Sequence, residues 1–402
     1  MLESDRVAPA EKDLTHSLFH RLMELFYIPA RWSDLEVGLA ALILAGLAAA
    51  AWLLFSQAFS LFVYALGLQL LFFTADYAVL VLRPRLRISF SGWKGQFFPL
   101  ILPRAAATAL VAPLGIWMGW PNAFALLVVI QTLGSAALLY GALHEPRRVG
   151  LSELKIATDR MAPGTRPIRI LHISDLHIER LSIREEQLLA IVDRVKPDVI
   201  VITGDYANLS FNLDPVTHEQ IRQYLSQLTA PYGVYATLGS PPVDLPELVS
   251  AVFTDTSIIL LRDKWQQVDL GQGRGLVLMG LDCRHDIPTD SHRLAKLVTA
   301  TPRDMPQVLL YHSPELMPQA VAAGIDLYLC GHTHGGQVRL PIIGPVLTMS
   351  ALGRRYVMGH YHEGNTHLYV SRGVGFEGLS APRVRFLCPP EVLLITIEPV
   401  GK

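Results

Sequence analysis

Charge is scarce in one part of this 402-residue chain and ordinary in the rest. Only 17% of the residues are charged, against about 25% in a typical soluble domain. Residues 35–143 hold very few of these side chains, namely Glu36, Asp76, Arg83, Arg85, Arg87, Lys94 and Arg104. The deficit is therefore local, and it predicts a membrane-embedded region followed by a soluble domain.

Other absences exclude whole classes of protein. The three cysteines, Cys283, Cys330 and Cys388, cannot all pair and form no CxxC motif, which excludes a disulfide-rich scaffold. Because 34 basic residues are balanced by 35 acidic ones, we expect no nucleic-acid partner. A hydrophobic content of 51% excludes a disordered chain.

The charge-poor region divides into four apolar runs of about 20 residues, the length that crosses a bilayer as a helix. These runs are Leu35–Phe55, Phe59–Leu82, Phe97–Trp120 and Pro121–Leu143. Helices buried in a soluble core are the alternative, but the very short connections argue against it. Asp76 and Arg104 are candidates for an intramembrane pair. Because both lie within about two turns of an end, we expect them to snorkel to the interface instead.

Basic residues predict the orientation of these four helices. They lie in three flanking segments, whereas the two tight connections carry none. The segments contain Arg6, Lys12, Arg21 and Arg31; Arg83, Arg85, Arg87 and Lys94; and Arg147, Arg148, Lys155 and Arg160. After four crossings all three segments lie on one side, which should be the cytoplasm. The sequence predicts a multi-pass protein of the cell membrane with a cytoplasmic C-terminal domain.

The chain before the first run, residues 1–34, is predicted to be a cytoplasmic amphipathic segment. Leu14–Tyr27 repeats apolar side chains at helical spacing, with polar residues on the opposite side. This helix either lies in the membrane interface or packs on the soluble domain, and the sequence does not distinguish the two.

Residues 168–402 alternate short apolar strands with amphipathic helices, which predicts an α/β domain. The predicted strands are Ile168–Ser174, Asp198–Thr203, Gly233–Leu238, Gly275–Asp282, Gln307–His312, Ile325–Cys330, Leu368–Ser371 and Val392–Ile397. The predicted helices are Ile183–Val195, Pro215–Leu228, Leu245–Phe253, Ser291–Ala300 and Glu315–Ala323. Residues 144–167 are rich in proline and glycine and are predicted to be a linker.

Carboxylate and imidazole side chains gather where these strands end. The set consists of Asp175, His177, Asp205, His312, His332 and His334. Ligands of α/β sheets collect at the carboxyl ends of strands, and residues two apart in extended backbone point the same way. Oxygen and nitrogen donors without thiolate suit Mn, Fe, Zn, Ni or Co, and six ligands suit two metal ions.

A lone histidine is more often an ordinary surface or core residue than a ligand. That interpretation covers His16, His20, His144, His218, His285, His292, His360, His362 and His367.

The chain resembles the calcineurin-like metallophosphoesterases in four ordered motifs. These are Asp175-Leu176-His177, Gly204-Asp205, His312 before Ser-Pro, and Gly331-His332-Thr333-His334-Gly335-Gly336. The motifs Ser371-Arg372-Gly373-Val374-Gly375 and Pro389-Pro390-Glu391 look like those of the bacterial membrane-associated phosphohydrolase branch. The resemblance covers about residues 168–398 and implies a two-sheet α/β sandwich, flanked by helices, with a dimetal site.

The resemblance also implies a role for each ligand. Asp175, His177 and His334 would bind one metal ion, Asp205 would bridge the pair, and His312 and His332 would bind the second ion. A hydroxide between the ions would then attack the phosphorus of a phosphomonoester or phosphodiester.

One family motif, Gly-Asn-His-Asp/Glu, is missing. The corresponding place reads Gly239-Ser240-Pro241-Pro242. Ser240 replaces the asparagine that ligates the second metal, so it is a doubtful ligand. Pro241 replaces the histidine that contacts phosphate and assists the leaving group, so no catalytic acid is assigned. Asp244 and Asn208 are candidate substitutes and otherwise ordinary loop residues.

Two functions from different classes are therefore consistent with the sequence. The first is a membrane-anchored dimetal phosphoesterase, attenuated by the lost motif; its support is the retention of six ligands. The second is a catalytically inactive, membrane-tethered module that binds metal or phosphate. Lipid headgroups, nucleotide-linked lipid precursors and soluble diesters are all candidate phosphate-ester substrates, and the sequence does not specify an oligomeric state.

Overall fold

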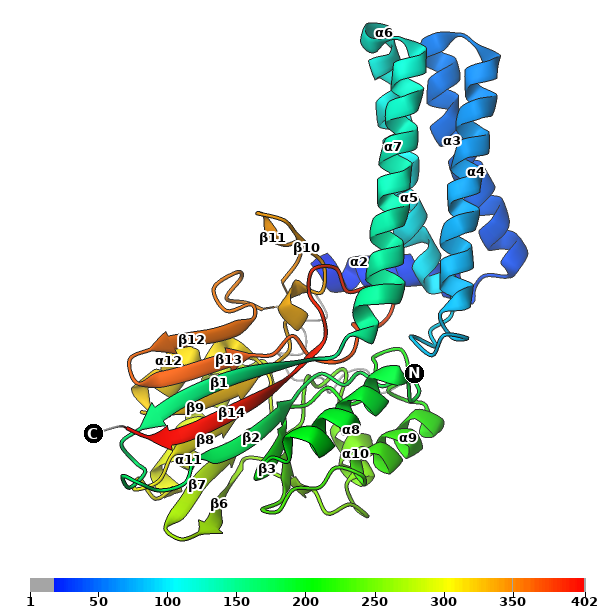
Figure 1. Ribbon diagram of the computed structural model, residues 1–402. Coiled ribbons are helices and arrows are strands. Elements are labelled where there is room, and N and C mark those ends of the chain that lie inside the picture. Colours follow the sequence, from blue (N-terminus) through cyan, green and yellow to red (C-terminus); the bar gives the residue numbers. More distant parts are fainter. Residues whose placement is uncertain (1–17, 349, 401–402) are drawn as a thin grey trace. The chain divides into compact units, whose positions relative to one another are not determined.

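A computed structural model describes residues 18–348 and 350–400 (Figure 1). The described chain divides into two compact units. The helical unit comprises residues 18–144 together with the late segment 377–384. The sandwich unit comprises the described residues of 145–376 and 385–400. Each unit is described by itself below.

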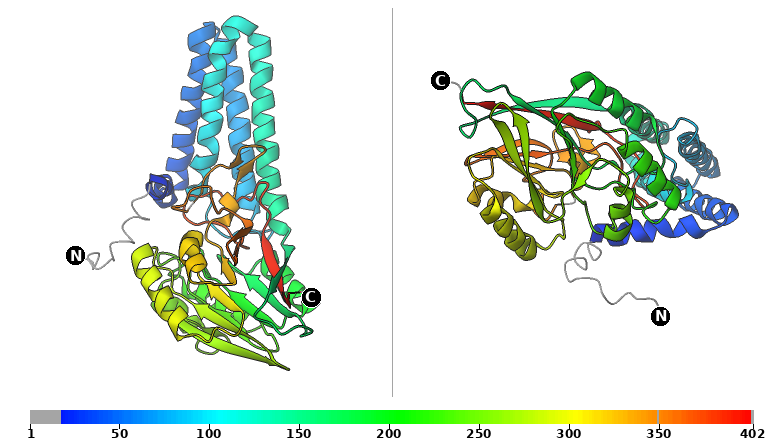
Figure 2. Two further views of the ribbon diagram at one scale, coloured as in Figure 1. Left: turned by 90° about the vertical axis from the view of Figure 1, so that its left-hand side faces the viewer. Right: turned by 90° about the horizontal axis from the view of Figure 1, so that it is seen from below.

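Among the described residues of the helical unit, four helices are long and apolar enough to cross a membrane. They are built on α3 (Asp34–Ser56), α4 (Phe59–Leu82), α5 (Lys94–Val111) and α7 (Trp120–Leu139). The short η2 (Ala112–Leu114) and α6 (Gly115–Met118) continue α5, and the π-helical turn η3 (Tyr140–His144) continues α7. The helices run alongside one another (Figure 2), with α3 on α4 and α5, and α7 on α4 and α5. The four apolar runs of the sequence are thus helices.

Helix α3 illustrates how these helices begin, end and pack. Ser33 and Glu36 cap its N-terminus reciprocally, and Gln57 ends it in a left-handed conformation. Its small side chains, with Trp52, are buried against α4 and α5, whereas Ile43 and Leu47 on the opposite face are 62% and 68% exposed. An apolar outer face is what a bilayer-spanning helix requires.

A shorter helix, α2 (Leu18–Tyr27), and the turn η1 (Ile28–Arg31) precede α3. Helix α2 packs on α5, and the Ser380 hydroxyl donates a hydrogen bond to the carbonyl oxygen of Met23 at 2.7 Å. The described part of the predicted amphipathic helix therefore belongs to the helical unit, while its first residues lie outside the described chain.

The expectation that Asp76 and Arg104 snorkel to the interface is wrong. Both are buried, and Arg104 Nε and Nη2 donate to the two carboxylate oxygens of Asp76 at 2.6 and 2.7 Å. Arg104 Nη1 also donates to Gln131 Oε1 at 3.0 Å. The reason is the length of the third span: because Lys94–Met118 is a 25-residue helix, Arg104 lies well inside it and not near an end.

Two mixed sheets form the sandwich unit (Figure 1). The first contains, in spatial order, β1 (Gly150–Thr158), β14 (Glu391–Pro399), β2 (Ile168–Ile173), β3 (Val199–Ile202), β4 (Val234–Ala236) and β5 (Ile259–Leu260). The second contains β12 (Gly359–Glu363), β13 (Thr366–Val370), β9 (Leu327–Cys330), β8 (Gln307–Leu310), β7 (Arg274–Gly280) and β6 (Lys264–Gly271). A small ribbon pairs β10 (Arg339–Leu340) with β11 (Gly344–Pro345).

Alternation along the central strands explains the layers. In β2, Ile168 and Ile170 face the core between the two sheets, whereas Leu171 and Ile173 face the flanking helices. On the first sheet these helices are α8 (Ile183–Val195), α9 (Pro215–Leu225) and α10 (Pro246–Val252). On the second they are α11 (Ile287–Ala300) and α12 (Met317–Ala322). The predicted two-sheet α/β sandwich is confirmed.

The segment 144–167, predicted to be a linker, contains strand β1. This strand pairs in parallel with β14 along its whole length and adds an edge to the first sheet. Its burial alternates, with Ile156 and Thr158 buried and Lys155 and Ala157 exposed. The prolines and glycines on either side of β1 indicate turns. Because the alternating stretch between them is short, it was not predicted as a strand from the sequence.

Candidate metal centre

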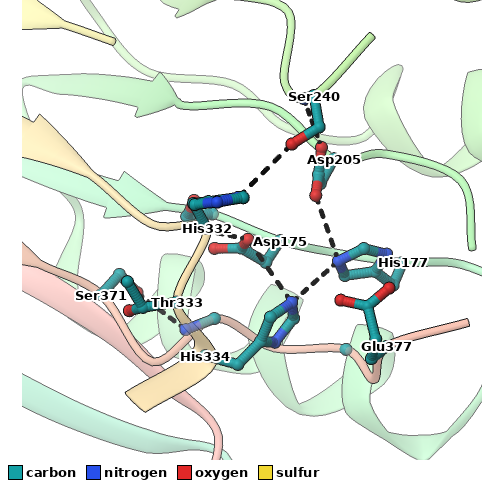
Figure 3. Close-up of polar contacts among 12 residues, drawn as sticks. Asp175, His177, Asp205, Ser240, His332, Thr333, His334, Ser371 and Glu377 are labelled. Atoms are coloured by element: carbon teal, nitrogen blue, oxygen red, sulfur yellow. Dashed lines mark hydrogen bonds and ion pairs between the residues drawn. The ribbon is translucent and has the colours of Figure 1, made fainter. Parts of the chain in front are cut away.

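The predicted ligands lie just beyond the carboxyl ends of parallel strands. Asp175 and His177 follow β2, Asp205 follows β3, Ser240 follows β4, His312 follows β8, and His332 and His334 follow β9. Strands β2 to β4 are parallel to one another, as are β8 and β9. Figure 3 labels all of these side chains except His312 and shows them pointing toward one another. The two sheets therefore contribute to one site.

Asp175, His177 and His334 form one group that could hold a metal ion, with ligand atoms within 4.8 Å of one another. The Nε2 atoms of His177 and His334 are 2.9 Å apart, and His334 Nε2 lies 3.6 Å from Asp175 Oδ1. All three residues are buried. These are the residues that the family resemblance assigns to the first ion.

Asp175, Asp205 and His312 form a second such group. One oxygen of Asp205, Oδ2, lies 3.3 Å from His177 Nε2 and 3.2 Å from His312 Nε2. Its other oxygen accepts a hydrogen bond from the backbone N–H of Ser240 at 2.8 Å. Asp205 thus lies between the two groups, where a bridging carboxylate would have to be.

His332 faces the same centre from the side of Ser240. Its Nδ1 lies 3.4 Å from the Ser240 hydroxyl oxygen, and its ring centroid is 5.3 Å from that of His312. Its backbone N–H donates to Asp175 Oδ1 at 2.9 Å, which fixes the carboxylate as well. The structure therefore brings together all six predicted ligands and the doubtful Ser240.

Backbone strain is concentrated at this site. Several ligands adopt the left-handed region that non-glycine residues rarely occupy, namely Asp175, His177, Asp205, His332 and His334, with φ between 42° and 70°. Conformations of this kind cost about 1–3 kcal/mol each and persist where the surrounding fold imposes them. They are typical of functional sites.

Two glycines allow the carboxylates to sit so close to neighbouring backbone. A Cβ atom on Gly331 would come within 1.9 Å of Asp175 Oδ2, and one on Gly239 within 2.1 Å of Asp205 Oδ1. Any side chain at either position would displace a carboxylate. These glycines belong to the predicted motifs at 331–336 and 239–242.

The donor atoms fit a metal ion on physical grounds. Asp175 Oδ2 is buried without a hydrogen-bond partner, and so is His312 Nε2, although an Asp205 oxygen lies 3.2 Å from that nitrogen. Buried polar atoms are normally satisfied, and the other oxygen of the Asp175 carboxylate, Oδ1, lies 3.6 Å from His334 Nε2 and 3.9 Å from His312 Nε2. A buried carboxylate with one unpaired oxygen and two imidazoles beside the other is suited to a bound cation. Imidazole and carboxylate donors suit a divalent transition metal.

Electrostatics hold three of the ligands, Asp205, His332 and His334, in forms that bind cations. Burial raises the pKa of Asp205, but His312 and His177 outweigh it and hold this pKa well below its usual range. Burial, together with His177 and Arg385, holds the pKa of His334 well below its usual range. Burial and the neighbouring His285 lower the pKa of His332 to about 3. Near pH 7 Asp205 is therefore ionised, and His332 and His334 are neutral, which are the forms that bind a metal ion. At His312, burial lowers the pKa but Asp205 raises it well above its usual value, so an ion bound there would displace a proton.

Outer contacts orient two of the histidines. His312 Nδ1 lies 2.7 Å from the carbonyl oxygen of Thr203, which leaves Nε2 directed at the aspartates. Arg385 Nη2 lies 3.1 Å from His334 Nδ1 and donates to the carbonyl oxygen of Gly375 at 2.6 Å. Contacts of this kind fix the ring that a metal would bind.

Neither candidate substitute for the missing asparagine lies at a ligand position. The Asp244 carboxylate accepts hydrogen bonds from the backbone N–H groups of Asp205, Tyr206 and Gly239 at 2.7–2.9 Å. Asp244 therefore joins the loop after β3 to the loop after β4. The Asn208 side chain donates to the carbonyl oxygen of Phe376 at 2.9 Å and accepts from Ser210. Both residues therefore have structural roles.

The sequence interpretation missed His285. Its Nε2 lies 3.1 Å from the Ser240 hydroxyl oxygen, and its ring centroid is 4.8 Å from that of His332. Burial lowers its pKa, but Cys283 and Glu315 raise it to about 10, so a metal ion bound by this imidazole would displace a proton. The sequence contained one indication of this position. A strand was predicted where β7 lies, and His285 follows the carboxyl end of that parallel strand, as the other site residues follow theirs.

Comparisons with known proteins agree with this geometry. The family model described as calcineurin-like phosphoesterase matches residues 168–240. The chain contains a calcineurin-like phosphoesterase domain. This family binds divalent metal ions. The match covers β2 to β4 and ends at Ser240, where the sequence departs from the family motif.

Relatives extend the similarity to a larger share of the chain. The chain is 29% identical to the uncharacterized metallophosphoesterase YkuE of Bacillus subtilis, over 64% of this chain and 89% of that protein. It is 26% identical to YkoQ of the same organism, over 67% and 98%. It is 27% identical to the phosphodiesterase YaeI of Escherichia coli, over 58% and 82%.

Proposed function

We propose that this chain is a membrane-anchored phosphoesterase that uses two divalent transition-metal ions to hydrolyse a phosphomonoester or phosphodiester. The observation that carries the proposal is the buried convergence of two aspartates and four histidines with orphaned donor atoms. Relatives named metallophosphoesterases and a phosphodiesterase support it. The metal could be Mn, Fe, Zn, Ni or Co.

The ligands divide naturally between two ions. Asp175, His177 and His334 would hold one, His312 and His332 the other, and Asp205 would lie between them. When bound, the ions would stabilise charge on the phosphoryl oxygens and lower the pKa of a coordinated water. Asp244 and the Thr203 carbonyl would keep Asp205 and His312 aligned for this role.

The lost motif restricts the substrate. Pro241 has no ionisable group, so segment 239–242 offers no acid for the leaving group. General acid assistance contributes about 10²–10⁴ in rate. We therefore propose that the enzyme acts on esters whose leaving group departs without a proton. Of the candidate substrates, nucleotide-linked lipid precursors meet this condition, because a phosphate leaves as an anion, whereas the alkoxide of a simple headgroup ester needs a proton. The helices would hold the domain at a membrane, where such a lipid is found.

The proposal includes the membrane region at 35–143, with the catalytic domain following it on the cytoplasmic side. The support is the apolar length of α3, α4, α5–α6 and α7 together with the basic residues that flank them. The segment 1–34 would then be cytoplasmic as well.

The decisive experiment measures hydrolysis of an aryl phosphodiester by the full-length protein in detergent with Mn²⁺ or Ni²⁺. Wild type should be active and should lose activity on chelation. His334→Ala should lose at least about 100-fold, since even outer contacts to metal ligands are worth about 10–100-fold. His292→Ala, which removes an exposed histidine of α11, is the matched control and should be unchanged.

The competing function is a catalytically inactive module, which the replacement of two motif positions by Ser240 and Pro241 favours. The double reversion Ser240→Asn plus Pro241→His separates the two. If wild type is no more active than His334→Ala while the reversion is active, the chain is a binding module. If wild type exceeds His334→Ala, the enzyme proposal stands.

A further inference from the structure

The site lacks a side chain where the family has its asparagine. Ser240 occupies that position, and its hydroxyl oxygen takes the place of the amide carbon of asparagine, one bond short of the ligating oxygen. A neutral serine hydroxyl is a poor metal ligand. The second ion would therefore have fewer donors than the first unless another residue reaches the same point.

His285 reaches that point from the opposite sheet. Its Nε2 lies 3.1 Å from the Ser240 hydroxyl oxygen, and that same oxygen is 3.4 Å from His332 Nδ1. Two imidazole nitrogens thus converge on the place that an asparagine would fill. The His285 side chain is only 4% exposed, so it is part of the site and not of the surface.

We propose that His285 is the missing ligand of the second metal ion. It would act together with His312, His332 and Asp205, in place of the family's asparagine. The inference rests on the proposed dimetal function and adds a residue from a strand end, that of β7, which no family motif supplies. Ser240 would then provide room for the larger imidazole ring.

The surroundings of His285 are those of a metal-binding histidine. Its second nitrogen, Nδ1, lies 3.6 Å from Glu315 Oε2. Glu315 is buried, and its other oxygen accepts a hydrogen bond from the backbone N–H of Ala351 at 2.8 Å. A carboxylate behind the far nitrogen of a ligating imidazole is a recurrent arrangement that orients the ring.

The backbone at His285 shares the strain of the other ligands. Its φ of 53° lies in the left-handed region, within the range spanned by Asp175, His177, Asp205, His332 and His334. A loop that merely connects β7 to α11 has no need of this conformation in a histidine. Cys283, at 3.6 Å from His285 Nε2, is the nearest competing donor.

Metal binding, measured apart from catalysis, tests the assignment. The full-length protein, purified in detergent without a histidine tag, is equilibrated with Mn²⁺ and its metal content and affinities are measured. Three stacked histidines on β12 and β13, the exposed His360 and His362 and the half-buried His367, are replaced by glutamine in every variant to remove weak surface binding. Wild type should bind two ions, with the paramagnetic resonance signal of a coupled pair.

His285→Ala should weaken the second ion by at least about 10-fold and convert the signal to that of an isolated ion. His285→Gln serves where the alanine variant does not fold. Adding Ser240→Asn to His285→Ala should restore the coupled pair by returning the family's ligand. His292→Ala is the matched control and should bind as wild type does.

Each other outcome overturns the inference in a different way. Two ions bound by His285→Ala with unchanged affinity would remove His285 from the ligand set while leaving the proposed function intact. The same result with weaker inhibition by inorganic phosphate would assign His285 to the substrate. Loss of the second ion in Cys283→Ala alone would assign the ligand to the thiol. Fewer than two ions in wild type would contradict the dimetal function itself.

Discussion

At the scale of single residues, the candidate metal ligands could be predicted from the positions of the strands along the sequence. Asp175, Asp205 and His312 stand directly after apolar strands, and the rule that ligands collect at strand ends places them together. His285 obeys the same rule but stands five residues past β7, beyond a loop whose left-handed turn at His285 itself cannot be predicted from composition. The role of Asp244 was equally hidden, because its partners are backbone N–H groups of other loops.

His172 predicts a pH dependence of folding. Burial on β2 lowers its pKa to about 3, whereas an unfolded chain would protonate it near its usual value of 6.5. As the pH falls from 6.5 toward 3, the unfolded state binds a proton that the folded state does not. The free energy of unfolding should therefore fall by up to about 1.4 kcal/mol per pH unit from this residue alone.

Thermal unfolding of the full-length protein in detergent between pH 7 and pH 4 measures this dependence. His172→Gln, which cannot ionise, should show a shallower loss of stability across that window even if it is less stable at pH 7. The exposed His292→Gln is the control. Parallel pH profiles for wild type and His172→Gln would refute the assignment.

At the scale of elements, short apolar runs predicted the central strands well, because every residue of β3, β4, β8 and β9 is buried. Amphipathic spacing predicted the helices of the sandwich unit. The sequence did not predict β1, whose short alternating stretch is bounded by turn residues, nor the strands β5, β6, β10, β11 and β12. It also failed for the polar pair of the helical unit. Asp76 and Arg104 come from α4 and α5, and only the packing of these two helices brings them together. No local pattern in either helix contains that information.

The Asp76–Arg104 pair predicts an asymmetric response to mutation. Arg104→Leu leaves the Asp76 carboxylate buried without its partner and should destabilise the helical unit by about 3–5 kcal/mol. Asp76→Leu plus Arg104→Leu removes both charges and should recover most of the loss. Helicity during denaturation of the detergent-solubilised protein reports the difference.

A surface pair provides the comparison for this experiment. Lys94 Nζ lies 2.7 Å from Asp34 Oδ1, and the two side chains are 26% and 77% exposed. Lys94→Met should cost about 1 kcal/mol or less, as exposed ion pairs do. Equal losses for Arg104→Leu and for the double variant would mean that the buried pair is not the cause.

At the scale of the whole molecule, composition distinguished an apolar region from a soluble domain. It did not predict at which residues the chain divides between the two units. Segment 377–384 belongs to the helical unit although it lies between two parts of the sandwich unit in sequence. Arg383, in that segment, is buried and donates to Ser91 Oγ at 2.8 Å and to the carbonyl oxygen of Leu379. The contact joins residues about 290 positions apart, a distance over which sequence patterns carry no signal.

The placement of basic residues predicts the topology of the whole chain. Arg85 and Arg87 are exposed between α4 and α5, whereas the turn at Gly119 between α6 and α7 has no charged neighbour. The positive-inside rule therefore predicts that Arg85, Arg87 and the C-terminal domain lie in the cytoplasm and that Gly119 lies outside. Green fluorescent protein fused after Lys402 should fluoresce, and alkaline phosphatase fused there should be inactive. Alkaline phosphatase inserted at Gly119 should be active. The opposite pattern would put the metal centre outside the cytoplasm, and the substrate would have to be sought there.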